Sequence, residues 1–149
     1  EREYLEQIVS ELEIGDSVTF TGQIREDEIP SYTKAGDVLL LPSLKESFGL
    51  VNLEAMYVGN PIIASNVGGI PEVVSHGVNG YIFTIGDQDE FIHYMESLSK
   101  NRQLMRKFGE QGKSIVEAKF SPSKIISEYE SFYYDVLEQV RSLKHNLII

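Results

Sequence analysis

The chain has 149 residues, of which 42% are apolar, 13 are basic and 23 are acidic. At this length one compact domain spanning residues 1–149 is expected, with enough buried surface to fold without disulfides or metals. The sequence has no cysteine, which excludes a disulfide scaffold, a thiol nucleophile and thiolate zinc sites, and its net charge of −10 argues against a nucleic-acid-binding protein.

The first elements in chain order alternate between helical and strand-like patterns. Tyr4–Leu12 places its apolar residues on one helical face, and Val18–Thr21 is short and β-favouring. Asp27–Ala35 predicts a short helix with Pro30 in its first turn. Asp37–Pro42 is a continuous apolar run, which is typical of a strand buried on both faces of a parallel sheet.

The remaining elements continue this alternation. They are expected over residues 50–58 (helix), 61–65 (strand), 71–74 (short helix), 81–83 (strand), 88–98, 102–117 and 121–143 (helices). Strands that alternate with helices predict an α/β fold, a Rossmann-like parallel sheet with helices on both faces. A doubly wound sheet usually begins with a strand and this chain opens on a helix, so we expect that its first βα unit is missing.

Two glutamates flank the segment that is richest in candidate ligand-binding groups. Glu46 follows a predicted strand, where α/β proteins bind ligands, and Glu54 lies eight residues later on the next helix. Each carboxylate can accept two hydroxyl hydrogen bonds, as a ribose or a sugar ring would offer. Between them, Ser47–Leu50 leads into the helix start, whose free amides and dipole favour a phosphate. The spacing alone favours two solvated glutamates, and the surrounding residues carry the functional interpretation.

These residues belong to a longer series of segments: Pro42–Met56, Gly59–Ser65, Gly68–Val74 and Gly77–Gly80. In this order and spacing they resemble the signature of the group 1 glycosyltransferases, the family 4 retaining enzymes of the two-domain GT-B fold. Glu46 and Glu54 match the E-x7-E motif of that family. The resemblance covers nearly the whole chain and implies the C-terminal, donor-binding half of a GT-B enzyme.

The resemblance implies a role for each matching residue. Glu46 would be the catalytic-site carboxylate that hydrogen-bonds the donor sugar, and Glu54 would hold the ribose hydroxyls. Val51 would lie near the phosphates or the ribose. Backbone amides would bind the sugar and the diphosphate at Ser47, Phe48, Gly49 and Leu50. Backbone groups would lie near the nucleobase at Gly22, Gln23 and Ile24.

The implied reaction is sugar transfer with retention from a nucleoside-diphosphate sugar (a UDP-, GDP- or ADP-sugar) to an acceptor hydroxyl. The acceptor would be a saccharide, a glycolipid or a small polyol, in a setting such as surface-polysaccharide assembly. The usual account needs no protein nucleophile, no cofactor and no metal. The sequence Asp87-Gln88-Asp89 resembles a metal motif of a different fold, but its position at a helix start favours an N-cap role for Asp87.

The family implies further parts that this sequence lacks. They are an acceptor-binding N-terminal domain and an upstream arginine and lysine that neutralise the diphosphate, so the chain alone is expected to be inactive. Helices within residues 101–143 would cross toward that domain, and the aromatic stripe Tyr129, Phe132 and Tyr133 would be core or, where the helix crosses, exposed and prone to self-association.

Location and charge give a further expectation. No apolar run reaches the roughly 18 residues of a membrane span and no signal peptide opens the chain, so we expect a cytoplasmic protein. Residues 100–124 hold seven basic and two acidic side chains, a net +5. This favours a solvated helix face, with peripheral binding to anionic membrane lipids as the alternative.

Two other interpretations remain open. The chain could be a non-catalytic nucleotide-binding domain or a protein-interaction domain of similar topology. The Gly68-Gly69 turn could bind phosphate at the start of a short helix or, the favoured interpretation, allow a tight turn packed against the sheet.

Overall fold

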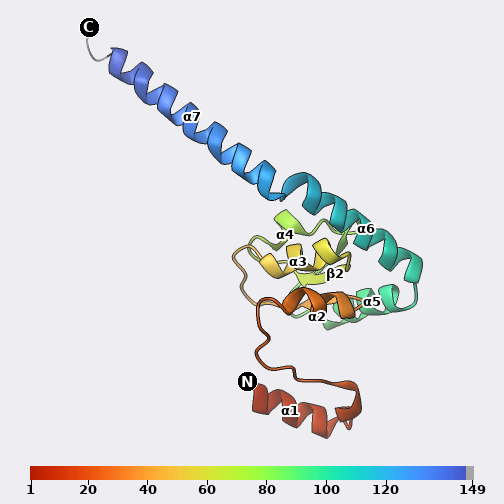
Figure 1. Cartoon of the computed structure of the whole chain (residues 1–149). Helices are drawn as coiled ribbons and strands as arrows, with labels where there is room; N and C mark the ends of the chain where they lie inside the picture. The colour runs from red at the N-terminus through yellow and green to blue at the C-terminus, as the bar shows by residue number, and fades with distance from the viewer. Residues whose placement is uncertain (147–149) are drawn as a thin grey trace.

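The computed structural model describes residues 1–146, with side chains described through residue 142. Its helices and strands are α1 Arg2–Glu11, the 3-10 turn η1 Gly15–Ser17, α2 Ile29–Ala35, β1 Leu39–Leu41, α3 Leu50–Val58, β2 Ile62–Ser65, α4 Ile70–Val73, β3 Gly80–Phe83, α5 Gln88–Ser99, α6 Arg102–Lys119 and α7 Pro122–Asn146 (Figure 1). The predicted order of elements is confirmed, except for the strand expected at Val18–Thr21.

The three strands form a parallel sheet in the order β1-β2-β3. Leu40 pairs with Ile63 on one side of β2, and Ile63 pairs with Tyr81 on the other. All four residues of β2 are buried, because the strand has a neighbour on each edge and helices on each face. The predicted parallel α/β architecture is therefore confirmed.

Successive β2 side chains enter two separate cores, one on each face of the sheet. Ile62 and Ala64 pack with buried residues of α3, α4 and α6: Ala55, Met56, Ile70, Val73 and Val116. Ile63, between them, packs on the opposite face with Phe83 of β3, Leu98 of α5 and Phe108 of α6. This alternation follows from the two-residue period of a strand and confirms helices on both faces.

Two predictions about strands are wrong. Val18–Thr21 is extended but belongs to no strand, because no other described segment pairs with it. The predicted fully buried strand at 37–42 shortens to β1, which pairs only with β2. Its Leu40 stays 40% exposed, because the second edge of β1 has no neighbour within the described chain.

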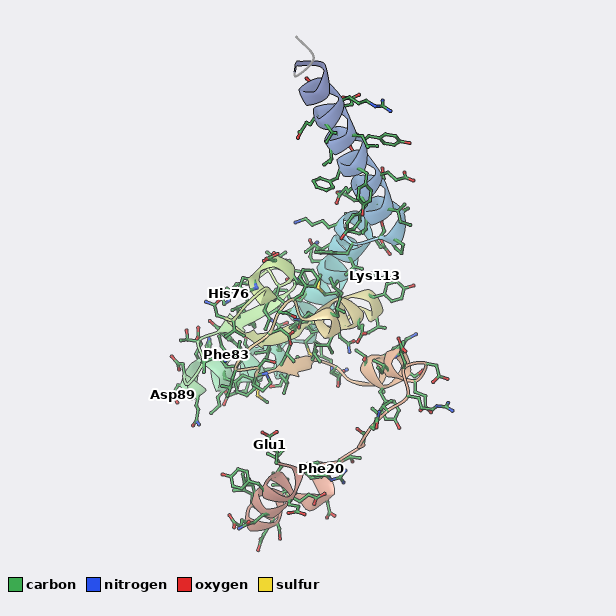
Figure 2. The ribbon with its side chains drawn as sticks, turned by 90° about the vertical axis from the view of Figure 1, so that its left-hand side faces the viewer. Glu1, Phe20, His76, Phe83, Asp89 and Lys113 are labelled. Carbon is green, nitrogen blue, oxygen red and sulfur yellow. The ribbon has the colours of Figure 1, made fainter. Side chains whose placement is uncertain are left out.

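The first helix lies apart from the sheet, at the end of an extended segment (Figures 1 and 2). None of its residues is buried. Its guanidinium group at Arg2 lies 5.4 Å from the ring centre of Phe20 and pairs with Glu6, so α1 contacts its own following segment.

The last helix projects away from the sheet (Figure 1). The stripe Tyr129, Phe132 and Tyr133 is exposed along it rather than buried in the core. Across the described residues, no helix combines the length and the apolar character that crossing a membrane requires.

A carboxylate joins α5 to the end of β3. Glu90 accepts hydrogen bonds from the Thr84 amide at 2.7 Å and from the Tyr94 hydroxyl at 2.9 Å. These bonds, the amide first, hold the pKa of Glu90 below its usual value of 4.5. Burial, followed by the hydrogen bond to Glu90, raises the pKa of Tyr94.

Acid is expected to destabilise the protein partly through Glu90. A group whose pKa is lowered by folding contributes stability above its unfolded pKa and loses it as the pH falls through its folded pKa, here from about 4.5 downward. Glu90→Gln should therefore flatten the loss of the thermal midpoint between about pH 7 and pH 3. Glu110→Gln, at an exposed glutamate of α6, is the control that keeps the wild-type slope. A wild-type slope in Glu90→Gln would contradict this assignment.

Candidate functional site

The candidate site lies where β1 and β2 end, at the same edge of the sheet. Two loops meet there, residues 42–49 after β1 and residues 66–69 after β2. Ser65 is the last residue of β2, and its hydroxyl donates a 2.6 Å hydrogen bond to the Ser43 carbonyl. The first loop is thereby anchored to the central strand before it reaches Glu46.

The second loop supports the first through backbone contacts. The Gly69 amide donates to the Ser47 carbonyl at 3.0 Å. Gly68 has a φ of +51°, and a Cβ atom added to it would stand 2.8 Å from the carbonyl carbon of Glu46 and overlap its oxygen. A Cβ on Gly69 would stand 2.5 Å from the Ser47 oxygen. These glycines allow close packing, as the favoured interpretation expected, but the contacts are with the Glu46 loop and not with the sheet.

Glu46 is held at the surface of this loop. It is half-buried, and its Oε1 accepts the amide hydrogen of Ser47 at 3.0 Å. One carboxylate oxygen is thus engaged by the backbone, which fixes the direction of the side chain. The other oxygen can accept hydrogen bonds from a ligand hydroxyl.

The loop ends in a helix start that has no side-chain cap. Gly49 is the N-cap residue in the left-handed conformation, with φ +80°. The backbone N–H of Asn52 donates a hydrogen bond to the Gly49 carbonyl at 2.9 Å. The amides of Leu50 and Val51 precede it at the positive end of the helix dipole, an arrangement that favours an anion.

Phe48 turns its ring away from this loop. The ring is half-buried against the α3 core and meets the edge of Phe120 with centroids 6.0 Å apart. This packing engages the ring within the protein, and the backbone role of Phe48 toward a ligand stays a prediction.

Glu54 lies on α3, just over one turn beyond Leu50, and is exposed. It lines an apolar hollow between α2, α3 and the end of α6, together with Leu53, Tyr57 and Phe120. A carboxylate at the rim of an apolar hollow can hold hydroxyls while the apolar wall contacts a flat ring.

The predicted nucleobase residues are not brought to this site. Gly22 lies beside α1, where the nearest atom to an added Cβ is the Arg2 guanidinium at 3.7 Å. Gln23 and Ile24 follow it in the extended segment between α1 and α2. Figure 2 shows the labelled Phe20, just before them, next to Glu1 and away from the sheet.

The Asp87-Gln88-Asp89 segment lies at the start of α5. Asp87 caps α5 by accepting the Glu90 amide at 2.9 Å, as predicted. Among the side chains that the structure describes, through residue 142, no group of three or more acidic or histidine side chains is arranged to hold a metal ion.

One buried polar residue of the site escaped the sequence reasoning. Asn52 lies between the two glutamates, is fully buried and has no hydrogen-bond partner for either side-chain atom among the described residues. A signal was available, because Asn52 shares a helix face with the apolar Ala55 and Met56.

Comparison with known proteins identifies similar sequences. The family model described as glycosyl transferases group 1 matches residues 1–115. The N-acetyl-alpha-D-glucosaminyl L-malate synthase of Bacillus anthracis is 43% identical over 138 residues, which are 93% of this chain and 36% of that protein. A D-inositol 3-phosphate glycosyltransferase of Streptomyces bingchenggensis is 29% identical, over 95% of this chain and 31% of that protein. The chain thus spans about a third of the length of these curated relatives.

Solved structures show the same fold. The sucrose-phosphate synthase of Thermosynechococcus elongatus superposes with a TM-score of 0.84 and 32% identity, over 93% of this chain and 35% of that one. HepE of Anabaena in complex with UDP-glucose superposes with a TM-score of 0.81 and 28% identity, over 89% and 36% of the two chains. The predicted Rossmann-like fold, similar to one half of a GT-B protein, is confirmed.

Proposed function

Because the chain belongs to the group 1 glycosyltransferases, we propose that it provides the donor-binding part of an enzyme that transfers a sugar from a nucleoside-diphosphate sugar to an acceptor hydroxyl. One observation carries the proposal most directly. The loop that bears Glu46 is anchored by the Gly68-Gly69 turn and leads into the uncapped start of α3. This arrangement combines a carboxylate for hydroxyls with amides for a phosphate.

Each part of the donor has a proposed partner. Glu46 accepts hydrogen bonds from the sugar hydroxyls, and the amides of residues 47–50 hold the sugar and the diphosphate. Val51 lies at the phosphates, and Glu54 accepts the ribose hydroxyls. Gly22, Gln23 and Ile24 remain candidates for the nucleobase only if residues 1–28 lie closer to the sheet when the donor is bound.

The proposed reaction proceeds with retention of configuration. The bond between the sugar carbon and the diphosphate oxygen breaks, and the diphosphate leaves with the electron pair. The acceptor hydroxyl attacks from the same face and transfers its proton to the leaving phosphate. Negative charge grows on that phosphate, so fixed amides and the α3 dipole stabilise the transition state most where the charge develops. No protein nucleophile and no metal take part in this proposal.

Relatives suggest which substrates to try first. Structures of Anabaena HepE contain UDP or UDP-glucose, so UDP heads a panel that also includes GDP and ADP. The Bacillus anthracis relative is named for an N-acetylglucosaminyl group and L-malate, which adds UDP-N-acetylglucosamine and L-malate to the donors and acceptors. Saccharides, glycolipids and inositol phosphates complete the acceptor panel.

An interaction domain is the second candidate function. The exposed aromatic stripe on α7 favours it, since such a surface can bind another protein. This alternative predicts no nucleotide binding, whereas the enzyme hypothesis predicts saturable binding.

Location in the cytoplasm, with or without contact to anionic lipid, is part of the proposal for the whole enzyme.

Removing the Glu54 carboxylate is expected to weaken nucleotide binding. Hydrogen bonds to a charged group contribute about 1.5–3 kcal/mol, which corresponds to roughly ten- to hundredfold in Kd. Isothermal titration calorimetry of the full-length protein with UDP, GDP and ADP would measure this loss of affinity in Glu54→Ala. Glu117→Ala is a matched control, because Glu117 is exposed and lines the same hollow from α6. Equal nucleotide affinity in Glu54→Ala and the wild type would contradict the ribose role.

A further inference from the structure

Asn52 is a buried polar side chain next to the candidate site that the proposed function does not use. It is fully buried, and both Nδ2 and Oδ1 are without a hydrogen-bond partner among the groups that the structure describes, whose side chains extend through residue 142. The other fully buried asparagine behaves differently. Asn79 accepts the Ser75 amide at 2.7 Å and donates to the Val73 carbonyl at 3.2 Å. Asn52 therefore differs from Asn79, whose buried side-chain amide is hydrogen-bonded.

The free amide of Asn52 is directed at the candidate site. Asn52 is the third residue of α3, and helical side chains point back toward the helix start. Its Nδ2 lies 2.5 Å from the point where a Cβ of Gly49 would stand, and the Cγ of Glu46 lies 3.4 Å from the same point. A side chain at residue 49 would collide with the Asn52 amide and lie against the Glu46 side chain, so the amide and Glu46 approach the same point beside Gly49.

The energetic cost of a buried amide without a partner argues for a ligand-bound state in which the Asn52 amide makes a hydrogen bond. A buried donor without a partner costs about 1–3 kcal/mol, and an apolar residue would avoid that cost. Residues around Asn52 on the buried face of α3 are apolar, including Ala55 and Met56. A carboxamide at this position is consequently unfavourable for stability and needs another explanation.

We propose that Asn52 is a positioning residue for Glu46. With a sugar donor bound, the Asn52 Nδ2 donates a hydrogen bond to the second carboxylate oxygen of Glu46, while Ser47 holds the first. The carboxylate is then fixed from two directions against the sugar hydroxyls. The inference rests on the donor-binding function proposed above and goes beyond it by assigning a residue outside the two-glutamate motif.

A comparison of UDP with UDP-glucose separates this role from a structural one. Glu46 contacts the sugar and not the nucleotide, so the loss of Asn52 should affect only the sugar-bearing ligand. In the full translated reading frame, Asn52→Leu is expected to raise the Kd for UDP-glucose about tenfold and to leave the Kd for UDP within about twofold. Isothermal titration gives both constants. Asn52→Ser provides the same test should Asn52→Leu not fold.

A double-mutant cycle tests whether Asn52 acts through Glu46. Glu46→Ala should weaken UDP-glucose and spare UDP, and Asn52→Leu added to it should produce no further loss, because the shared interaction is already absent. Additive losses in the double variant would overturn the positioning role. So would equal weakening of UDP and UDP-glucose in Asn52→Leu, or no change for either.

Stability supplies the matched control. Asn52→Leu is expected to keep or raise the thermal midpoint, because it removes an unpaired buried amide. Asn79→Leu is expected to lower it by several degrees, because the Ser75 amide and the Val73 carbonyl lose their partner. A wild-type chain that binds neither UDP, UDP-glucose, GDP nor ADP would overturn the donor-binding function and this inference together. Binding of UDP-glucose that is insensitive to Asn52 would overturn the inference alone.

Discussion

Replacing Gly68 with alanine is expected to abolish tight binding of the nucleotide sugar and to lower the free energy of unfolding. The added Cβ would overlap the Glu46 carbonyl oxygen and stand 2.8 Å from its carbon. Both groups belong to the backbone, so neither can rotate away as a side chain would. The loop of Glu46 must separate from the turn after β2.

The size of the effect follows from two contributions. Overpacking costs about 1–3 kcal/mol, and a left-handed alanine, here with φ +51°, adds about 1–2 kcal/mol. A displacement of roughly 1 Å at a positioning group reduces function about hundredfold, and the Glu46 loop would move by that order. Urea unfolding and titration with UDP-glucose, on the full translated reading frame, measure the two losses.

Gly77→Ala separates backbone strain from the clash. Gly77 also has a positive φ, +75°, but an added Cβ meets no atom within 4 Å. Its alanine variant should lose only about 1 kcal/mol and bind UDP-glucose as the wild type does. If Gly68→Ala were no worse than Gly77→Ala, the support of the Glu46 loop by this turn would be disproved.

Alanine at Gly109 is expected to destabilise the protein, against the usual effect of such a change in a helix. Within a helix, glycine to alanine normally stabilises by about 1 kcal/mol. Gly109 lies in α6 where that helix crosses the end of α3, and its Cβ would overlap the Gly59 oxygen and stand 2.9 Å from the Gly59 carbonyl carbon. The two helices must move apart, and we expect a net loss of about 2–3 kcal/mol.

Gly112→Ala is the control for this crossing. It lies on the same helix, and its Cβ would meet the Met56 side chain, at 3.1 Å from Cγ. A methionine side chain is flexible and can move, so the change should stay within about 1 kcal/mol of the wild type. Urea unfolding of both variants gives the comparison. Stabilisation by Gly109→Ala would show that α3 and α6 do not pack as closely as the structure indicates.

Gly68 and Gly109 both affect the position of the candidate site. Gly68 holds the loop before α3, and Gly109 holds the helix itself at its far end, next to Gly59. The groups proposed to bind the sugar donor, between residues 46 and 54, are therefore positioned by backbone contacts at both ends. Substitutions there should alter binding without touching a ligand group.

Features that depend on residues close together in the chain could be predicted from the sequence. The start and end of α3, the proline in the first turn of α2 and the Asp87 cap of α5 were all predicted and are confirmed. Each rests on conformational preferences or hydrogen bonds within about four residues. The candidate donor loop was also located from sequence, because its glutamates and glycines lie within one short segment. The individual binding roles of these residues stay predictions.

Features that depend on contacts between distant parts of the chain could be seen only in the folded structure. Whether β1 is buried, where Gly22 lies and whether α7 is covered follow from which segments pack together, and the local pattern is the same in either case. The contacts of Gly68 with Glu46 and of Gly109 with Gly59 join segments 22 and 50 residues apart, so no local periodicity predicts them. The unpaired amide of Asn52 became visible for the same reason, since burial and the absence of a partner are properties of the packed interior and not of residue type.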